Sequence, residues 1–451
     1  MVTVPRAGSV PAAPPTPVGA VGRRELRDLR AARRGRSRAA ISNALEGTPG
    51  RLRIAAIVAV LACAAFALLG ASAFQARGNA LAEARSDAAQ LVRVQQIATS
   101  VVKADSLFTN GYLAYGLDPT DQLNAYDDAI ATASRSIAEA SRANPADAAD
   151  LAVVNDALTQ YTARVAAARA NNAQGNQVAT GYLRQAANLL RQGTTSPNML
   201  PTLQKLITAN TQRVDDAYAT SSWAVLRLAL AALLALGGLV AVQVWLARHT
   251  HRYLNTPLAA ATVAVALVLA GGAVVMVNAQ SRANSIRDGA YTSTLALAKA
   301  RIGAYTAKSN ESISLIYIGT GGPYATSEGL YASSLAEVRT QLAKVTGVDS
   351  GAAKLAPWDT LHATIYARAQ TDWPGAVKAG IDTGTDSVNE AFAAFDKATD
   401  AALNSQASAV DDGLGGSHGA LVALGWLTLV VGLIAAGAAW AGISQRLEEY
   451  R

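Results

Sequence analysis

The chain is poor in the residues that most often carry chemistry or crosslink a fold. It contains one cysteine, Cys63, and four histidines among 451 residues. A single cysteine cannot close a disulfide within the chain, so its polar parts must hold together by packing alone. No Walker phosphate loop, nucleophile elbow, His-Glu-x-x-His pair or Cys-x-x-Cys pair is present. We therefore expect no enzymatic activity, no cofactor and no metal site.

The remaining ionisable residues form no catalytic pattern in the sequence. His249 and His251 stand two apart, but no acidic or thiol ligand lies near them to complete a metal site. We assign three carboxylates to solvated faces of predicted helices: Asp105, Asp127 and Asp128. A transporter would need polar groups in the middle of its membrane spans, and the apolar runs carry almost none. Enzyme and transporter are both disfavoured.

Four long apolar runs are the strongest positive signal. Each is long enough to cross a bilayer core, which takes about 20 mainly apolar residues in a helix. Two polar blocks of about 145 residues lie between the first and second runs and between the third and fourth. The predicted organisation is a basic segment 1–53, spans 54–74, 222–246, 257–277 and 419–442, polar blocks 75–221 and 278–418, a loop 247–256 and a tail 443–451. The chain reads as two copies of a span–block–span unit.

The distribution of charge predicts the orientation of the spans. Residues 1–53 hold eleven arginines and three acidic residues, whereas the two polar blocks are slightly acidic. Basic segments beside spans stay in the cytoplasm, so we expect both termini inside and both blocks outside a plasma membrane. Segment 1–53 is expected to be largely disordered and to contact anionic lipid; without interleaved aromatic residues, it does not suggest nucleic-acid binding.

The first apolar run has a second interpretation. The sequence Ala71-Ser72-Ala73 resembles a signal-peptide cleavage site. The basic leader is unusually long for a signal peptide, however, and the apolar run has the length of a span. We therefore favour an uncleaved anchor.

The first polar block shows the heptad spacing of packed helices. Two series of small or apolar residues recur every seven positions: Val94, Val101, Phe108 and Tyr115, with Ile97, Ala104 and Gly111 three places later. This spacing is typical of a helical bundle. A helix continuous with the first span should end at the Gly116–Pro119 turn, and further helices are predicted over 121–143, 148–170 and 177–192, with a last helix entering the second span.

The second polar block repeats this plan. Its first helix should run to Ile318 and end at the turn Gly319–Pro323, 203 residues after the turn of the first block. Further helices are predicted over 326–345, 357–379 and 386–411, the last with Val388, Phe395, Ala402 and Ala409 in one seam. The predicted fold is an all-α membrane protein: four transmembrane helices with two extracytoplasmic antiparallel four-helix bundles in a tandem repeat.

The blocks resemble the periplasmic four-helix-bundle sensor domains of bacterial chemoreceptors. The resemblance rests on the long first helices, on Tyr115-Gly116-Leu117-Asp118 as a helix stop and on the Gln174-Gly175-Asn176 break. It implies a receptor in which a small helix displacement crosses the membrane. No cytoplasmic signalling module is recognisable in the sequence, so we expect a signal to pass to a separate protein.

The duplicated four-span plan is similar to the actinobacterial GlnX-like membrane proteins. This likeness covers nearly the whole chain in plan and composition and includes no diagnostic motif, so no family residue is transferred. It implies two partners: an external solute-binding lipoprotein of glutamine, glutamate or aspartate type, and a soluble cytoplasmic serine/threonine protein kinase.

We predict a non-catalytic signal relay whose partner or ligand contacts the turn ends of the bundles. The candidate residues are Tyr112, Tyr115, Asp118, Asn176, Tyr182, Tyr317, Tyr324, Trp373 and Asp382. Aromatic residues with a few polar groups suit protein contacts, although the tyrosines could instead cap the bundle cores. Two other functions stay open: a structural scaffold of the cell envelope, and a direct small-molecule sensor. The ligand, the direction of regulation and homo-oligomerisation are likewise open.

Overall fold

The computed structural model describes residues 48–114, 120–191, 198–250, 255–416 and 418–448, and its regular elements in these ranges are helices. The chain packs as two compact units. We call Met1–Leu68, Ala231–Val268 and Leu429–Arg451 the span unit, and Leu69–Leu230 and Leu269–Thr428 the helical unit.

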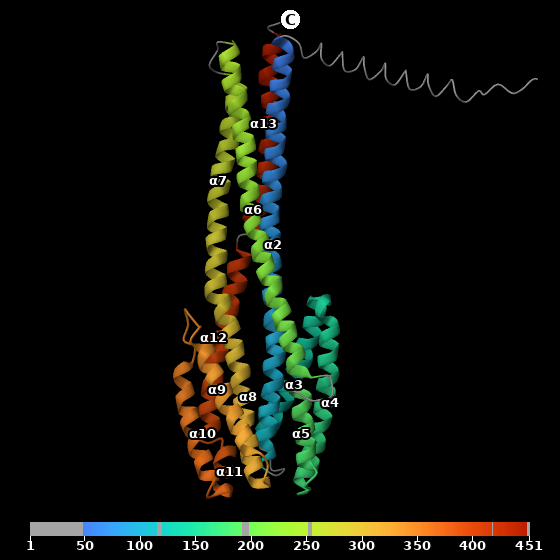
Figure 1. Ribbon diagram of the computed structural model, residues 1–451, viewed down its shortest axis with the longest axis vertical. Helices are drawn as coiled ribbons and strands as arrows, with labels where there is room; N and C mark the ends of the chain where they lie inside the picture. Colours follow the sequence, from blue (N-terminus) through green and yellow to red (C-terminus); the bar gives the residue numbers. More distant parts are fainter. Residues whose placement is uncertain (1–47, 115–119, 192–197, 251–254, 417, 449–451) are drawn as a thin grey trace, which may run out of the picture. The chain divides into compact units, whose positions relative to one another are not determined.

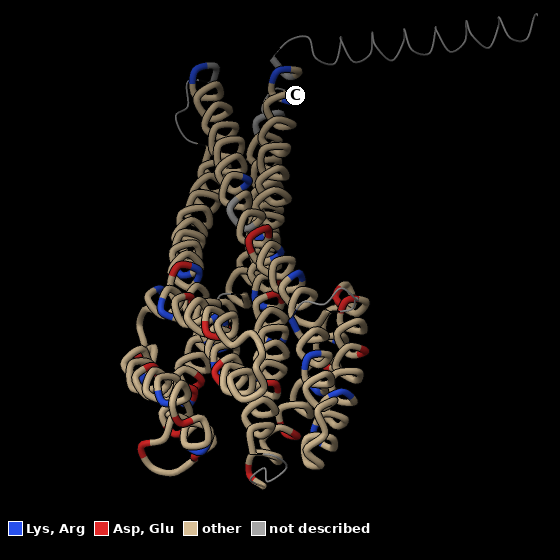
Figure 2. Tube along the Cα trace, turned by 60° about the horizontal axis from the view of Figure 1, so that its bottom comes forward, with Lys and Arg blue, Asp and Glu red and all other residues tan. Residues whose placement is uncertain are grey.

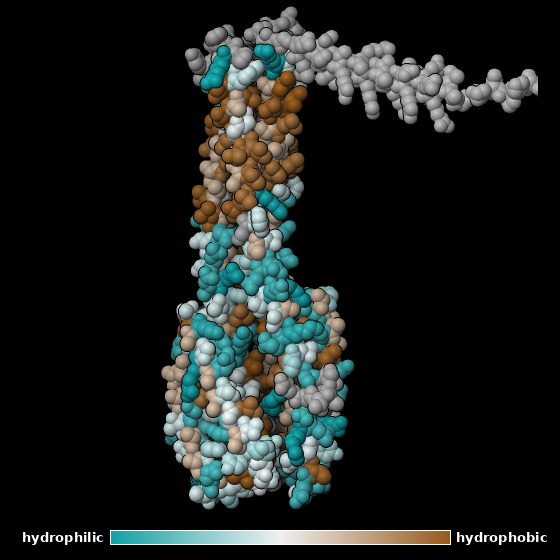
Figure 3. All heavy atoms as spheres, in the orientation of Figure 1, coloured by the Kyte–Doolittle hydropathy of each residue, from teal (hydrophilic) through white to brown (hydrophobic). Residues whose placement is uncertain are grey.

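The span unit is built from parts of four helices. They are α2 (Thr48–Tyr112), α6 (Met199–Thr250), α7 (Thr256–Ile286) and α13 (His418–Glu448), each of which contains a stretch long and apolar enough to cross a membrane. Large apolar side chains stay exposed along these stretches, such as Leu233 at 72% and Leu267 at 68%. Figures 2 and 3 show the stretches almost free of charge and strongly hydrophobic. The predicted all-α, multi-pass membrane protein is thus confirmed.

Small residues let the spans approach closely. A Cβ added to Gly238 of α6 would stand 2.8 Å from the Cβ of Ala62 in α2, and one added to Gly432 of α13 would stand 2.6 Å from the Cβ of Ala67. Helix pairs in lipid depend on such contacts because no hydrophobic effect drives them together there.

The first half of the helical unit joins α2 and α6 to three shorter helices (Figure 1). These are α3 (Thr120–Ala143), α4 (Ala148–Ala173), which follows the 3₁₀ turn η1 (Pro145–Asp147), and α5 (Ala179–Leu190). Val94, Ile97, Val101 and Phe108 of the predicted seam are all buried. The heptad interpretation of α2 is therefore confirmed.

The second half repeats the arrangement with different details. Its elements are the π-helical turn η2 (Arg287–Tyr291), α8 (Thr292–Thr320), α9 (Tyr324–Leu342), the 3₁₀ turn η3 (Ala352–Lys354), α10 (Leu355–Ala369), α11 (Trp373–Ile381) and α12 (Val388–Gly415). Trp358 is fully buried, with its ring centroid 4.9 Å from that of Phe392 in an edge-to-face contact. Such pairs stabilise a core beyond their buried area.

Two predictions for this half were wrong in detail. The single helix expected over 357–379 is divided into α10 and α11, because the Asp372 side chain accepts the N–H of Gly375 at 3.0 Å and Pro374 occupies the first turn of α11. In α12, Ala409 is exposed and Val410 is buried in its place. A strict seven-residue repeat drifts by ~20° per heptad on a straight helix, and three heptads from Val388 suffice to move the seam.

Contacts between the halves follow the sequence repeat. Arg77 of α2 donates to Gln280 of α7, 203 residues later, and the Ser309 hydroxyl of α8 donates to Asp105 of α2 across 204 residues at 2.7 Å. The first offset equals the 203 residues between Gly116 and Gly319, and the second exceeds it by one. Equivalent helices of the two halves therefore contact each other at nearly equivalent positions.

A buried carboxylate joins three elements of the first half. Asp147 of η1 accepts hydrogen bonds from Arg213 at 2.8 Å, Asn210 at 2.9 Å and Gln90 at 3.0 Å. Burial by itself would raise the pKa of Asp147, but these donors hold it below its ordinary value. The cluster ties the α3–α4 connection to α2 and α6.

Replacing Asp147 tests this tie. Asp147→Ala should cost about 3–5 kcal/mol because it leaves the Arg213 charge without its buried partner. The matched control is Asp150→Ala: its pair with Lys205, 2.9 Å long, is largely exposed, so its loss should cost under about 1 kcal/mol. The measurement is the melting temperature of the full chain in detergent, followed by circular dichroism. Equal decreases in melting temperature for the two variants would contradict the role of Asp147 in tying the α3–α4 connection to α2 and α6.

Candidate functional site

A polar cavity lies between the end of α2 and the glycine turn that ends α8, and we call it the turn cavity. Its volume is about 710 Å³. Four segments of the helical unit line it: Tyr112–Leu113 at the end of α2, Asn172–Arg184 around the α4–α5 turn, Ile316–Pro323 in the last turn of α8 and just after it, and Trp373 of α11. A cavity of this size matches those that hold small ligands.

The glycine turn after α8 shapes one wall. Gly321 has φ 68°, a left-handed conformation that glycine adopts without strain, and the Gly322 N–H closes the helix on the Tyr317 carbonyl at 2.8 Å. At Gly319 an added Cβ would stand 2.3 Å from the Trp373 ring. This close approach lets the Trp373 indole donate to the Leu315 carbonyl at 2.7 Å, so the turn and α11 hold each other in place.

The opposite wall comes from the α4–α5 turn. Asn172 is buried and donates to the Tyr112 carbonyl at 2.7 Å, which holds the end of α2 against α4. The Tyr112 hydroxyl lies 3.3 Å from Thr180 Oγ1, and Asn176 donates to Asn171 at 3.1 Å within the turn. The side chains that shape this wall are therefore largely held by hydrogen bonds.

The charge of the lining residues is one-sided. Arg184 lies on the wall and is exposed, and among the described residues it makes no ion pair. No carboxylate belongs to the described lining; its polar side chains are amides, hydroxyls, the indole and this guanidinium. Such a lining favours a small anionic or strongly polar ligand over a cation.

The structure places four of the nine predicted residues on this cavity: Tyr112, Asn176, Tyr317 and Trp373. The other described candidates, Tyr182, Tyr324 and Asp382, do not line it. Tyr324 is 36% exposed at the start of α9, and Asp382 accepts the Gly384 N–H at 2.9 Å in the turn after α11. Tyr115 and Asp118 lie outside the described residues.

A buried ionic cluster joins the halves beside the cavity. Asp105 of α2 is 1% exposed. It pairs with Arg191, which follows α5, and accepts from the Ser309 hydroxyl of α8 at 2.7 Å and from the Tyr161 hydroxyl of α4 at 3.3 Å. The prediction of a solvated face for Asp105 was wrong, because α4 and the residue after α5 cover this position from the first half and α8 covers it from the second. Asp127 and Asp128 are exposed as predicted.

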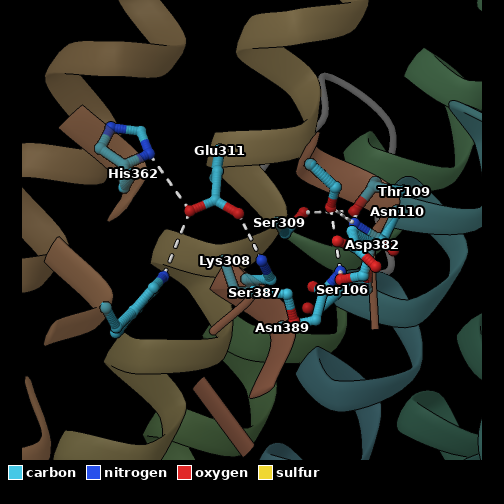
Figure 4. A network of polar contacts seen from close by, with 12 residues as sticks. Ser106, Thr109, Asn110, Lys308, Ser309, Glu311, His362, Asp382, Ser387 and Asn389 are labelled. Atoms are coloured by element: carbon cyan, nitrogen blue, oxygen red, sulfur yellow. Dashed lines mark hydrogen bonds and ion pairs between the residues drawn. The ribbon is translucent and has the colours of Figure 1, made fainter. Parts of the chain in front are cut away.

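Amide side chains connect the halves at a neighbouring point (Figure 4). Asn110 of α2 donates to the Gly380 carbonyl of α11 at 2.9 Å, and Asn389 of α12 donates to the same carbonyl at 3.0 Å. The position 203 residues after Asn110 is Ile313, which instead lines an apolar groove of about 690 Å³ between α5–α6 and α8–α9. Figure 3 shows this hydrophobic hollow between the two halves. The repeat is therefore asymmetric.

The interior of the second half holds a different ionic cluster. Glu311 is 2% exposed and accepts from Lys308, from the Trp358 indole at 3.2 Å and from His362 at 3.2 Å. Burial by itself would raise the pKa of Glu311, but Lys308 and His362 lower it to about 2. Glu311 is therefore ionised at neutral pH.

His362 lies between two carboxylates. Its Nδ1 faces Glu311 at 3.2 Å and its Nε2 faces Glu328 at 3.0 Å, while Tyr331 stacks on the ring with 3.5 Å between centroids. Both nitrogens can donate only in the protonated ring. Burial would lower the pKa of His362, but its hydrogen bonds to the two carboxylates raise it to about 9. We therefore describe His362 as a buried imidazolium.

Sequence reasoning missed both clusters. In the sequence, Asp105 and Glu311 are single carboxylates on long helices. Apart from Lys308, three residues before Glu311, their partners stand 47 to 204 residues away. The available signal was the repeat itself: the positions 203 residues after Asp105 and Ser106 are Lys308 and Ser309. Polar residues at equivalent seam positions of both halves indicate a shared buried interface. Among the described residues, no group of His, Cys, Asp and Glu could hold a metal ion.

The imidazolium predicts how stability depends on pH. Because its pKa is raised from 6.5 to about 9, His362 contributes stability that is complete below about pH 6.5 and is lost as pH rises through 9. The melting temperature of the native chain minus that of His362→Gln should therefore shrink between pH 6 and pH 10. The melting temperatures of both proteins across this range provide the measurement. A constant difference would contradict a protonated His362.

Comparison with known proteins gives one match. The family model described as the actinobacterial sensor domain matches residues 80–219, the first polar block. No curated protein and no solved structure matches the chain. The match covers 140 of the 451 residues and supports a role in sensing or signalling.

Proposed function

We propose that the chain is a non-catalytic relay that detects an extracytoplasmic solute at the turn cavity and passes the signal to a separate cytoplasmic protein. The observation that carries the proposal is the continuity of its helices. α2 extends without a break from residues of the span unit to Tyr112 on the cavity wall. Since α2 also carries Asp105, a change at the cavity is coupled to the buried seam and to a membrane-capable segment through one rigid element.

The proposed topology rests on charge. The eleven arginines of residues 1–53 favour a cytoplasmic N-terminus. One span then precedes the first polar block and three precede the second, so both blocks, and with them the turn cavity, would lie outside the cell. The tight packing of the spans on small residues is compatible with helix shifts of ~1–2 Å, the scale on which such interfaces switch. A shift requires that the ligand bind the two packings with different affinity.

The proposed partners come from the resemblance to GlnX-like proteins. An amino-acid-binding lipoprotein would dock at the turn cavity, and a serine/threonine protein kinase would read the cytoplasmic surfaces. Trp373 and Tyr317 on the cavity wall, with exposed Tyr324 at the start of α9, are residue types that anchor protein interfaces. The two asparagines of the wall add hydrogen-bonding groups to the same surface.

Spin-label distances test the relay. The single native cysteine is first removed by Cys63→Ala. One label pair is then placed at Val178 and Leu330, exposed in the two halves of the helical unit, and a second at Val240 and Val263, exposed on α6 and α7 of the span unit. The full chain in nanodiscs is measured alone and with an amino-acid-loaded solute-binding lipoprotein of the glutamine, glutamate or aspartate type.

A relay should change both label distances when the loaded lipoprotein is added. A change confined to the first pair would show docking without transmission and would contradict the relay. No change at either pair would favour the envelope scaffold. The empty lipoprotein is the control for docking that does not depend on the solute.

Direct sensing is a second candidate. It is favoured by Arg184, which makes no ion pair with the residues that the structure describes, and by a cavity lining without described carboxylates. A small carboxylate such as succinate or L-glutamate would pair with Arg184 and accept hydrogen bonds from the amides of the wall. At 100 times its Kd, such a ligand stabilises the folded chain by ~2.7 kcal/mol.

Thermal shifts of the full chain test direct sensing. Succinate and L-glutamate should raise the melting temperature, uncharged L-glutamine should not, and Arg184→Gln should abolish the rise. The matched control is Arg164→Gln, which removes an exposed arginine of α4 away from the cavity. If the melting temperature still rose in Arg184→Gln, or rose equally with L-glutamine, direct sensing through Arg184 would be excluded. The proposal of a docked lipoprotein would be unaffected.

A further inference from the structure

A second cavity of about 500 Å³ lies inside the span unit between α2 and α6, and we call it the α2–α6 cleft. Its lining residues are Arg51, Ile54, Ala55 and Val58 from α2, with Ala241, Val242 and Trp245 from α6. The four residues of α2 follow the spacing i, i+3, i+4, i+7, which places them on one face of the helix. The cleft is thus an apolar slot with one cationic residue.

The cleft is closed at one end by helix contact. Three residues before Ala241, Gly238 packs against Ala62, where an added Cβ would leave 2.8 Å between the two Cβ atoms. Arg51 stands seven residues before Val58 on α2, which corresponds to about 10 Å along the helix. The apolar slot therefore extends from a close helix contact toward a guanidinium.

The opening faces the surroundings of the spans. Ile54 is 45% exposed and Val58 is 42% exposed, although both belong to a membrane-capable stretch. A cavity with these walls offers water few hydrogen-bonding partners. Within a bilayer, a hydrocarbon chain is the occupant that restores van der Waals contact to such walls.

The charged end of the α2–α6 cleft indicates which kind of lipid headgroup fits it. Arg51 is exposed and makes no ion pair among the described residues. Guanidinium groups bind phosphates through paired hydrogen bonds, and tryptophans such as Trp245 settle at headgroup depth. The adjoining sequence 1–53 carries a net charge of +8 from eleven arginines and three acidic residues, which draws anionic lipids to the same leaflet.

We propose that the α2–α6 cleft binds one anionic phospholipid, with an acyl chain between the helices and its phosphate on Arg51. The lipid would fill a gap between the first and second spans, the two helices that leave the first half of the helical unit. This inference concerns lipid binding alone and does not depend on the proposed sensing function.

Native mass spectrometry of the full chain tests the site. The protein is released from nanodiscs containing equal amounts of phosphatidylglycerol and phosphatidylcholine with the same acyl chains. The native chain should retain one phosphatidylglycerol in preference to phosphatidylcholine. Arg51→Gln should weaken that retention by about tenfold, the effect of losing a charge-assisted hydrogen bond, and Ala241→Phe should reduce it by filling the slot.

The matched control is Arg53→Gln, two residues along the same helix. Arg53 is also exposed but does not line the cleft, so its variant should retain the lipid as the native chain does. If Arg51→Gln and Arg53→Gln lowered phosphatidylglycerol retention equally, the retention would depend on general surface charge, and the proposed site would be overturned. Equal retention of both lipids, or no retained lipid in the native chain, would overturn it as well.

Discussion

The structure depends on a buried charge that the two halves share. The Asp105 carboxylate of α2 is satisfied by Arg191, which follows α5, and by Ser309 of α8. An ion removed from water costs several kcal/mol unless its partners are correctly placed, so this cluster allows few relative positions of the three segments. It fixes the register in which equivalent helices lie side by side and thereby holds the walls of the turn cavity.

The two halves have kept their architecture and diverged inside it. The first half is tied by Asp147 to Arg213 and two amides, whereas the second encloses Glu311 with Lys308 and the His362 imidazolium. Where α2 carries Asn110, hydrogen-bonded to Gly380, α8 carries Ile313 beside an open groove. The two halves of the chain thus resemble the subunits of a dimer in architecture but differ in their interior residues. A ligand bound between the halves would contact two different walls.

This asymmetry suits a sensor. Both halves line the polar cavity, so a ligand bound there would contact both, and the family match to residues 80–219 supports a sensing role for the first half. α2 is one unbroken helix from Thr48 to Tyr112, and its residues belong to both units. The ionic clusters oppose gradual deformation, because a buried charge that has lost part of its partners is more costly than a fully paired one.

The sequence alone determined the spans, the helical class and the repeat, because these depend on local composition and on periodicity. Runs such as Ile54–Phe74 and seams such as Val94–Phe108 carry their burial pattern in residue spacing. Only the tertiary structure decided which polar residues are buried: Asp105 and Glu311 have the local pattern of solvated positions until distant helices cover them. It also decided which predicted candidates line the turn cavity: Tyr112 and Trp373 do, and Tyr182 does not. Such contacts join residues far apart in the chain, and helical periodicity carries no information about them.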